Sequence, residues 1–101
     1  MLENHPQPRE IKPENVLLAL GNPIRLGVLQ LLAQHGEQSC NTLRGNIAKL
    51  TMTHHWRVLR DSGVIWQRPV GRENLISRRR DCIDHRFPSL LEALLTAMVK
   101  R

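Results

Sequence analysis

The chain has 101 residues, a length typical of one small domain, and a net charge of +6. No run approaches the roughly 20 apolar residues of a membrane span, and the first residues lack a signal peptide's basic-then-apolar layout, so a cytoplasmic protein without membrane partners is expected. Two cysteines are too few for a disulfide-stabilised secreted fold, and 3% aromatic residues argue against a surface that stacks single-stranded nucleic acid.

The positive charge is concentrated in the middle of the chain. Residues 44–80 carry nine Lys and Arg against two Asp and Glu, whereas the segments on either side balance to −1 and to zero. Eight of these nine cations are arginines, whose planar guanidinium groups suit contacts to phosphates and base edges. The distribution predicts a surface that binds a polyanion, with a solvated basic face as the alternative.

The N-terminal part predicts a tail followed by a helix. Residues 1–12 contain prolines and charges without apolar periodicity, so we expect a flexible tail, with the folded domain covering residues 13–101. Pro13 fits the first turn of a helix, and Glu14 suits its positive end. The apolar stripe of this helix follows at helical spacing: Val16, Leu17 and Leu20.

Two further helices are predicted before residue 48. Asn22 is suited to cap a second helix, Pro23 to its first position and Gly36 to its end. A third, short helix is expected from about Ser39 or Asn41 to Asn46. The apolar content of the chain is enough for a small core around these helices.

The segment from Lys49 to Ser62 predicts an amphipathic helix that ends at Gly63. At about 100° per residue, one stripe is apolar: Met52, Trp56 and Leu59. The opposite side collects Leu50, Thr53, His54, Arg57 and Asp61. Hydroxyl, imidazole and guanidinium groups all bind DNA in a major groove, so this side is a candidate DNA-binding face, with a solvated helix face as the alternative. His55 lies nearer the buried edge, where a DNA contact and a structural hydrogen bond are the two alternatives.

A basic hairpin is predicted directly after this helix. Residues 64–66 and 74–77 have the composition of two strands, and the turn between them carries Arg68 and Arg72. Both arginines are candidates for phosphate or minor-groove contacts. The run Arg78–Arg80, with Arg79 at its centre, is a candidate extension of the phosphate contacts, or else a solvated charge run. A basic hairpin after an amphipathic helix is typical of a winged helix-turn-helix.

The C-terminal segment predicts a helix with a wide apolar stripe, and Pro88 falls in its first turn. Its apolar residues recur at helical spacing: Phe87, Leu90, Leu91, Leu94, Leu95 and Met98. We expect this stripe and Leu17 to form a two-fold homodimer through the first and last helices, the alternative being that the stripe covers only its own core. The expected fold is therefore mainly α, with about five helices and one small β-hairpin.

Residues 51–65, TMTHHWRVLRDSGVI, resemble the recognition helix of the ArsR-type winged-helix transcriptional regulators. Residues 18–25 are similar to that family's Leu-Ala-x-Pro-x-Arg opening, and residues 68–74 to its wing, so the resemblance covers roughly residues 14–100. It implies a homodimeric repressor that binds a pseudo-palindromic operator in double-stranded DNA and is released by an unidentified inducer. The resemblance implies DNA-binding positions on the recognition helix and the wing at Lys49, Thr51, Thr53, His54, His55, Arg57, Arg68 and Arg72. Arg60 on the same helix and Arg79 from the basic run are added as candidates.

The chain departs from the family pattern in two places. Ala48 stands where members often carry a capping serine. The family's thiolate metal motif would fall at Ser39-Cys40-Asn41, and a single thiolate does not make a tetrahedral soft-metal site. We therefore expect no metal and no cofactor, in line with the resemblance of residues 87–91, FPSLL, to a metal-independent branch.

The sequence also bears on three other functions. Cys40 and Cys82 are candidates for a thiol switch, which requires a lowered pKa and close approach of the sulfurs, or else are inert small residues. A winged-helix module that binds an acidic protein or RNA is the alternative to a DNA-binding regulator. An enzyme is not expected, because no carboxylate lies at motif spacing from the histidines or from Cys40.

Overall fold

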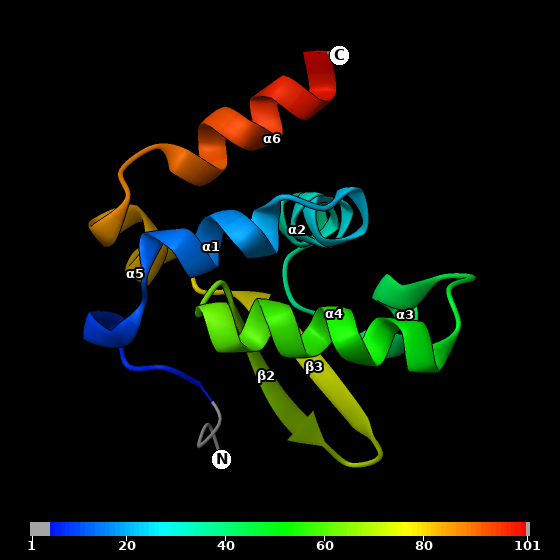
Figure 1. The fold of residues 1–101 in the computed structure, drawn as a ribbon. Helices are drawn as coiled ribbons and strands as arrows, with labels where there is room; N and C mark the ends of the chain where they lie inside the picture. The colour runs from blue at the N-terminus through cyan, green and yellow to red at the C-terminus, as the bar shows by residue number, and fades with distance from the viewer. Residues whose placement is uncertain (1–4, 101) are drawn as a thin grey trace.

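Helices and a small sheet alternate along the chain in the computed structural model, which describes residues 5–100 and the side chains of residues 5–99. The elements in order are η1 (Pro8–Glu10), α1 (Pro13–Leu20), α2 (Pro23–His35), β1 (Gln38–Ser39), α3 (Cys40–Arg44), α4 (Lys49–Ser62), β2 (Ile65–Val70), β3 (Glu73–Arg78), α5 (Arg80–Arg86) and α6 (Leu90–Lys100). This mainly helical winged fold confirms the expected class (Figure 1). The described residues form six α-helices rather than about five, because residues 80–86, interpreted as a charge run and its neighbours, form α5.

Local signals place the ends of the helices as predicted. The Asn22 side chain accepts hydrogen bonds from the backbone N–H groups of Ile24 and Arg25 at 2.9 and 3.3 Å, and Pro23 opens α2. Ala48 precedes α4 without a side-chain cap, as its methyl group requires. Gly63 ends α4 in the left-handed region at φ 86°, where a side chain is disfavoured.

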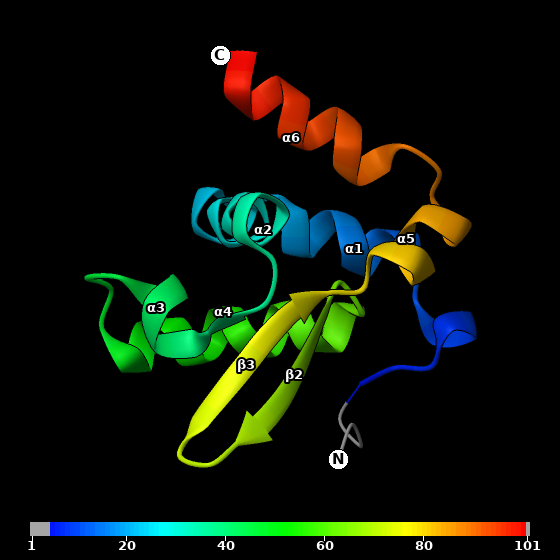
Figure 2. The same ribbon diagram turned by 180° about the vertical axis from the view of Figure 1, so that it is seen from behind.

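The hairpin is longer than expected and is part of a three-stranded antiparallel sheet of order β1-β3-β2. Ile65 pairs with Arg78 and Val70 with Glu73, so only residues 71 and 72 form the turn. The hairpin extends away from the helices (Figure 2). The two-residue strand β1, which pairs with β3, was not predicted, because two residues carry no periodic pattern.

The core lies between α1, α2, α4 and the sheet. The predicted apolar stripe of α4 is confirmed, since Met52, Trp56 and Leu59 are all buried. They pack with the buried residues of the first two helices and of the sheet: Val16, Ala19, Leu20, Val28, Leu29, Leu32, Ile65 and Ile76. This burial fixes which side of α4 is left facing solvent.

The N-terminal segment, expected to be a flexible tail, packs against the domain from residue 5 to residue 12. Ile11 is only 1% exposed and belongs to the core. The His5 ring lies 5.3 Å from that of Trp66, and the backbone N–H of Gln67 donates to His5 Nε2 at 2.9 Å. These contacts are tertiary and leave no periodic pattern in the sequence. Residues 1–4 of the expected tail and residue 101 of the expected domain lie outside the described residues.

The last helix begins at Leu90 rather than at Phe87. Ser89, just before it, has a φ of 65°, which interrupts a helix starting near Pro88. Among the described residues no single helix has the length and apolar character needed to cross a bilayer; α1 and α2 reach them only as a pair bent by 94°.

Candidate nucleic-acid interface

The polar side of α4 is open to solvent. In Figure 1 no other helix or strand lies in front of α4. Five of the predicted contact residues on this helix are exposed: Lys49, Thr51, Thr53, His54 and Arg57. Thr53 Oγ1 donates to the backbone carbonyl of Lys49 at 2.9 Å, which leaves its oxygen able to accept a further hydrogen bond. The helix therefore presents hydroxyl, imidazole and guanidinium groups together on one uncovered surface.

A cationic cleft adjoins this surface. It has a volume of about 340 Å³ and lies between α3, α4 and the hairpin. Its positively charged lining residues come from all three parts: Arg44, Lys49, Arg57, Arg60 and Arg72. Arg44 was missed by the sequence analysis, because only the packing of α3 beside α4 brings it to the cleft. Five cations around one opening, with Glu73 as an acidic neighbour, favour binding of a phosphate backbone.

Arg60 has a structural contact in addition to its place in the cleft. Its Nη1 donates to Gln67 Oε1 at 3.2 Å, and its side chain is 22% exposed. The bond joins the C-terminal half of α4 to strand β2. Arg60 thus links the recognition helix to the hairpin, and it is also one of the residues that line the cleft.

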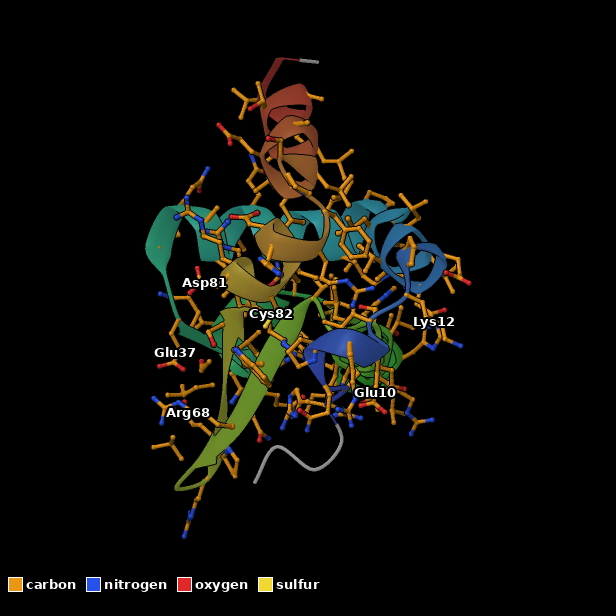
Figure 3. All side chains as sticks on the ribbon, turned by 90° about the vertical axis from the view of Figure 1, so that its left-hand side faces the viewer. Glu10, Lys12, Glu37, Arg68, Asp81 and Cys82 are labelled. Atoms are coloured by element: carbon orange, nitrogen blue, oxygen red, sulfur yellow. The ribbon has the colours of Figure 1, made fainter. Side chains whose placement is uncertain are left out.

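The two hairpin arginines are placed differently. Arg72 is exposed at the tip. Arg68 forms a bidentate ion pair with Glu37, in which Nε and Nη2 donate at 2.9 and 2.8 Å, and Figure 3 shows this side chain directed toward Glu37. The hydrogen bonds from Arg68 hold the pKa of Glu37 below its usual value, with the Arg68 charge adding to the effect. In this structure Arg68 is therefore engaged by a carboxylate of its own chain.

We expect Glu37→Gln to bind duplex DNA more tightly, by roughly threefold to tenfold at about 0.1 M salt, because Arg68 is released and a negative charge beside the wing is lost. Fluorescence anisotropy titrations over a range of salt concentrations measure this, and the log–log salt slope should steepen by about 0.9 for each phosphate gained. Glu92→Gln on α6 removes the same charge elsewhere. Equal affinities of the two variants would show that Glu37 does not withhold Arg68.

His55 points into the protein and not toward the surface. It is 7% exposed, and its Nδ1 accepts a hydrogen bond from Arg25 Nη1 at 3.0 Å. Arg25 also donates to the carbonyls of Ala19 at 2.7 Å and Leu18 at 3.0 Å, in the last turn of α1. The expectation of a DNA contact by His55 is therefore wrong, and its structural alternative holds. The Arg25–His55 pair links α1 to the recognition helix.

The same contact makes stability depend on pH. Burial lowers the pKa of His55 from 6.5, and the charges of Arg25 and His54 lower it further. Below pH of about 6.5 the unfolded chain takes up the proton more readily than the folded chain, so the free energy of unfolding falls as the pH drops toward the lowered pKa. Urea unfolding at pH 7.5 and pH 5.5 measures this dependence. Between the two pH values the free energy of unfolding should fall less for His55→Asn, which retains an acceptor, than for the parent. His85→Asn, which removes an exposed histidine on α5, should lose as much stability as the parent. An equal loss for His55→Asn and the parent would contradict this assignment.

Arg79 is also placed inside the protein. Its side chain is 1% exposed, with the guanidinium carbon 3.8 Å from the centre of the Trp66 ring. Nη1 donates to the carbonyl of Pro6 at 2.7 Å. The expected phosphate contact by Arg79 is therefore wrong. Three consecutive arginines predict a surface charge run, and only the position of Trp66 on the neighbouring strand explains why the middle one turns inward.

The two cysteines are far apart within one chain. Cys40 lies on α3 and Cys82 on α5, which occupy opposite sides of the domain in Figures 1 and 2, and both thiols are free. Burial raises the pKa of Cys40 to about 11, which disfavours the reactive thiolate. A switch that joins these two thiols within one chain does not fit this arrangement. Among residues 5–100, no group of three or more His, Cys, Asp or Glu side chains is placed to hold a metal ion.

The predicted dimer residues fall into two groups. Leu91 was expected to contact the second copy, but it is 2% exposed and is part of the core of its own chain. Leu17 is exposed on α1, near Phe87 and Leu90, and these three residues help to line an apolar cavity of about 520 Å³. Leu94, Leu95 and Met98 are half-buried. Most of the predicted stripe thus retains some accessible apolar surface.

The helix pair α3–α4, the open polar face of α4 and the basic hairpin after it define the winged helix-turn-helix class of DNA-binding proteins. A family model described as a helix-turn-helix domain matches residues 20–68. The chain is 30% identical over 82 residues to the uncharacterized HTH-type transcriptional regulator YceK of Bacillus subtilis (strain 168), covering 78% of this chain and 82% of that protein.

A solved structure agrees in fold along almost the whole chain. The crystal structure of an ArsR family transcriptional regulator superimposes with a TM-score of 0.65 at 22% identity, covering 95% of this chain and 93% of the other. The chain belongs to the HTH-type transcriptional regulators, and its fold is that of the ArsR family structure. The family is one of DNA-binding regulators and not of enzymes.

Proposed function

We propose that two copies of the chain bind a pseudo-palindromic site in double-stranded DNA in the cytoplasm and repress transcription until an inducing signal releases them. The observation that carries this proposal is the continuity of the polar face of α4 with the cationic cleft. In this arrangement α4 enters a major groove, where Thr53, His54 and Arg57 contact base edges. Cations around the cleft and at the hairpin tip contact the flanking phosphates.

The apolar cavity between α1 and the start of α6 supports pairing of two copies. Its lining is almost wholly apolar: Pro13, Leu17, Phe87, Pro88, Ser89, Leu90 and Ala93. Contiguous apolar surface of this kind marks a contact site, and two-fold pairs are the commonest protein oligomers. A two-fold dimer would place its recognition helices in successive major grooves, about 34–36 Å apart.

The proposal includes regulation without a bound metal. Ser39 and Asn41 stand at the positions of the family's thiolate motif, which leaves Cys40 as a single sulfur there. The Ser39 hydroxyl is used within the fold, because it accepts from the backbone N–H of Thr42 at 3.1 Å and caps α3. In this chain the segment begins α3, with Ser39 as its N-cap.

The sharpest test uses one arginine inside the interface and one outside it. Preferred duplexes are selected from a random pool and their affinities measured by fluorescence anisotropy. Arg57→Ala should weaken each half-site by about 1–3 kcal/mol and reduce the preference over unrelated DNA. Arg80→Ala, which removes the same side chain from the exposed surface of α5, should retain that preference. If Arg57→Ala binds as tightly and as selectively as the parent, α4 does not read the DNA.

The same selection also tests the alternative partners, RNA and an acidic protein. Equal binding to selected and unrelated duplexes, together with tighter binding to RNA or to an acidic protein, would favour a winged-helix interaction module over a DNA-binding regulator. The small content of Phe, Trp and Tyr, together with the burial of Trp56 on α4, favours the duplex.

A further inference from the structure

Leu50 is an apolar residue in the middle of the polar face of α4. It is 89% exposed, the highest value among the large hydrophobic side chains that the structure shows to be exposed. It is the second residue of α4 and makes no contribution to the core. Stability of the folded chain therefore does not explain why a leucine occupies this position.

The neighbours of Leu50 are residues of the proposed DNA-binding face. Thr53, His54 and Arg57 follow it at three, four and seven residues, a spacing that places all four side chains on one side of the helix. Cations flank this side, with Lys49 adjacent in sequence and Arg57 two turns along. A cationic surround suits a polyanion rather than an apolar protein surface, so charge complementarity favours DNA as the partner of this leucine.

In a major groove, one group on the base edges is apolar. Guanine, cytosine and adenine present hydrogen-bonding groups there, whereas thymine also presents its C5-methyl group. The N-terminal residues of a recognition helix are the ones that approach the base edges. Against a donor or acceptor, a leucine side chain would displace water without replacing its hydrogen bonds.

We propose that Leu50 contacts a thymine C5-methyl group and selects a T·A pair at one position of each half-site. This inference rests on the proposed function, because it requires α4 to lie in the major groove. It goes further by assigning the chemistry of one base pair to one side chain that has no polar group.

The test replaces thymine by deoxyuracil, which lacks only the C5-methyl group. Each thymine of a selected duplex is replaced in turn, in both half-sites, and affinities are measured by anisotropy for the parent and for Leu50→Ala. For the parent, one position should lose about fourfold in affinity per half-site, the factor expected for one buried methyl group. Leu50→Ala should bind the thymine duplex more weakly and show no loss on replacement by deoxyuracil at that position.

Leu31→Ala on α2 is the matched control, since it shortens a partly exposed leucine outside the interface and should keep the full response to deoxyuracil. The inference is overturned if the parent prefers its selected duplex but no thymine position responds, or if Leu50→Ala responds like the parent. The proposed function would survive either result. If no duplex is preferred over unrelated DNA, the proposed function itself fails.

Discussion

Replacing Gly63 by alanine is expected to lower the free energy of unfolding by about 3 kcal/mol. Gly63 ends the recognition helix at φ 86°, a conformation that costs a residue with a Cβ about 1–2 kcal/mol. A Cβ at this position would also lie 2.5 Å from Ile11 Cγ1, and this buried side chain has little room to move. Overpacking of this kind costs about 1–3 kcal/mol. Urea denaturation followed by circular dichroism measures the change.

Gly71→Ala separates the two causes. Gly71 also has a positive φ, 61°, but the space around its Cβ position is open, so only the backbone cost of about 1–2 kcal/mol is expected there. If both alanine variants lose the same stability, the packing of Ile11 against the end of α4 is not restrictive. Gly63→Ala is also introduced into the Ile11→Ala variant. If it then lowers the free energy of unfolding by less than it does in the parent, the clash with Ile11 is the cause of the difference.

Arg25→Ala is expected to lower the free energy of unfolding by about 2–4 kcal/mol and to weaken DNA binding as well. Its guanidinium, 7% exposed, donates to two carbonyls at the end of α1 and to His55 on α4. Removing it leaves these acceptors without their donor and opens a cavity beside the recognition helix. The pKa of Arg25 is lowered by burial, which reflects the cost of holding this charge inside and limits the net loss.

Arg44→Ala provides the comparison for Arg25→Ala. Arg44 is half-buried and donates to the carbonyl of Ile47 at 3.0 Å, so its loss should cost about 1 kcal/mol. Chemical denaturation of both variants at pH 7.5 gives the two values. Similar stability losses would contradict the view that Arg25 joins α1 to α4, as would a stable Arg25→Ala protein with unchanged DNA affinity.

Features with a local cause were predictable from the sequence. Asn22-Pro23 and Gly63 mark helix ends through backbone chemistry that needs no other part of the chain. The two faces of α4 follow from the spacing of Met52 and Trp56 along a helix. The same helical spacing predicted correctly that most of the α4 residues expected to bind DNA are exposed.

Features that depend on distant contacts were not predictable. Arg79 is buried because its guanidinium stacks on the ring of Trp66, and His55 because Arg25, 30 residues earlier, reaches it. Arg68 pairs with Glu37, 31 residues away, although its place in a basic turn indicates a free cation. In each case the residue type and the local pattern suit a surface position, and a partner from another element decides the outcome. The local sequence therefore predicts least well the position of a basic side chain that has a partner on another element.

Dimethyl sulfate footprinting on a selected duplex tests the role of α4 most sharply. Dimethyl sulfate methylates guanine N7, which lies in the major groove, and adenine N3, which lies in the minor groove. Two copies reading successive major grooves should protect guanine N7 in two patches about 10 base pairs apart, and Arg57→Ala should weaken that protection. Protection of adenine N3 alone, or a bound complex with every guanine N7 still reactive, would show that α4 does not enter the major groove.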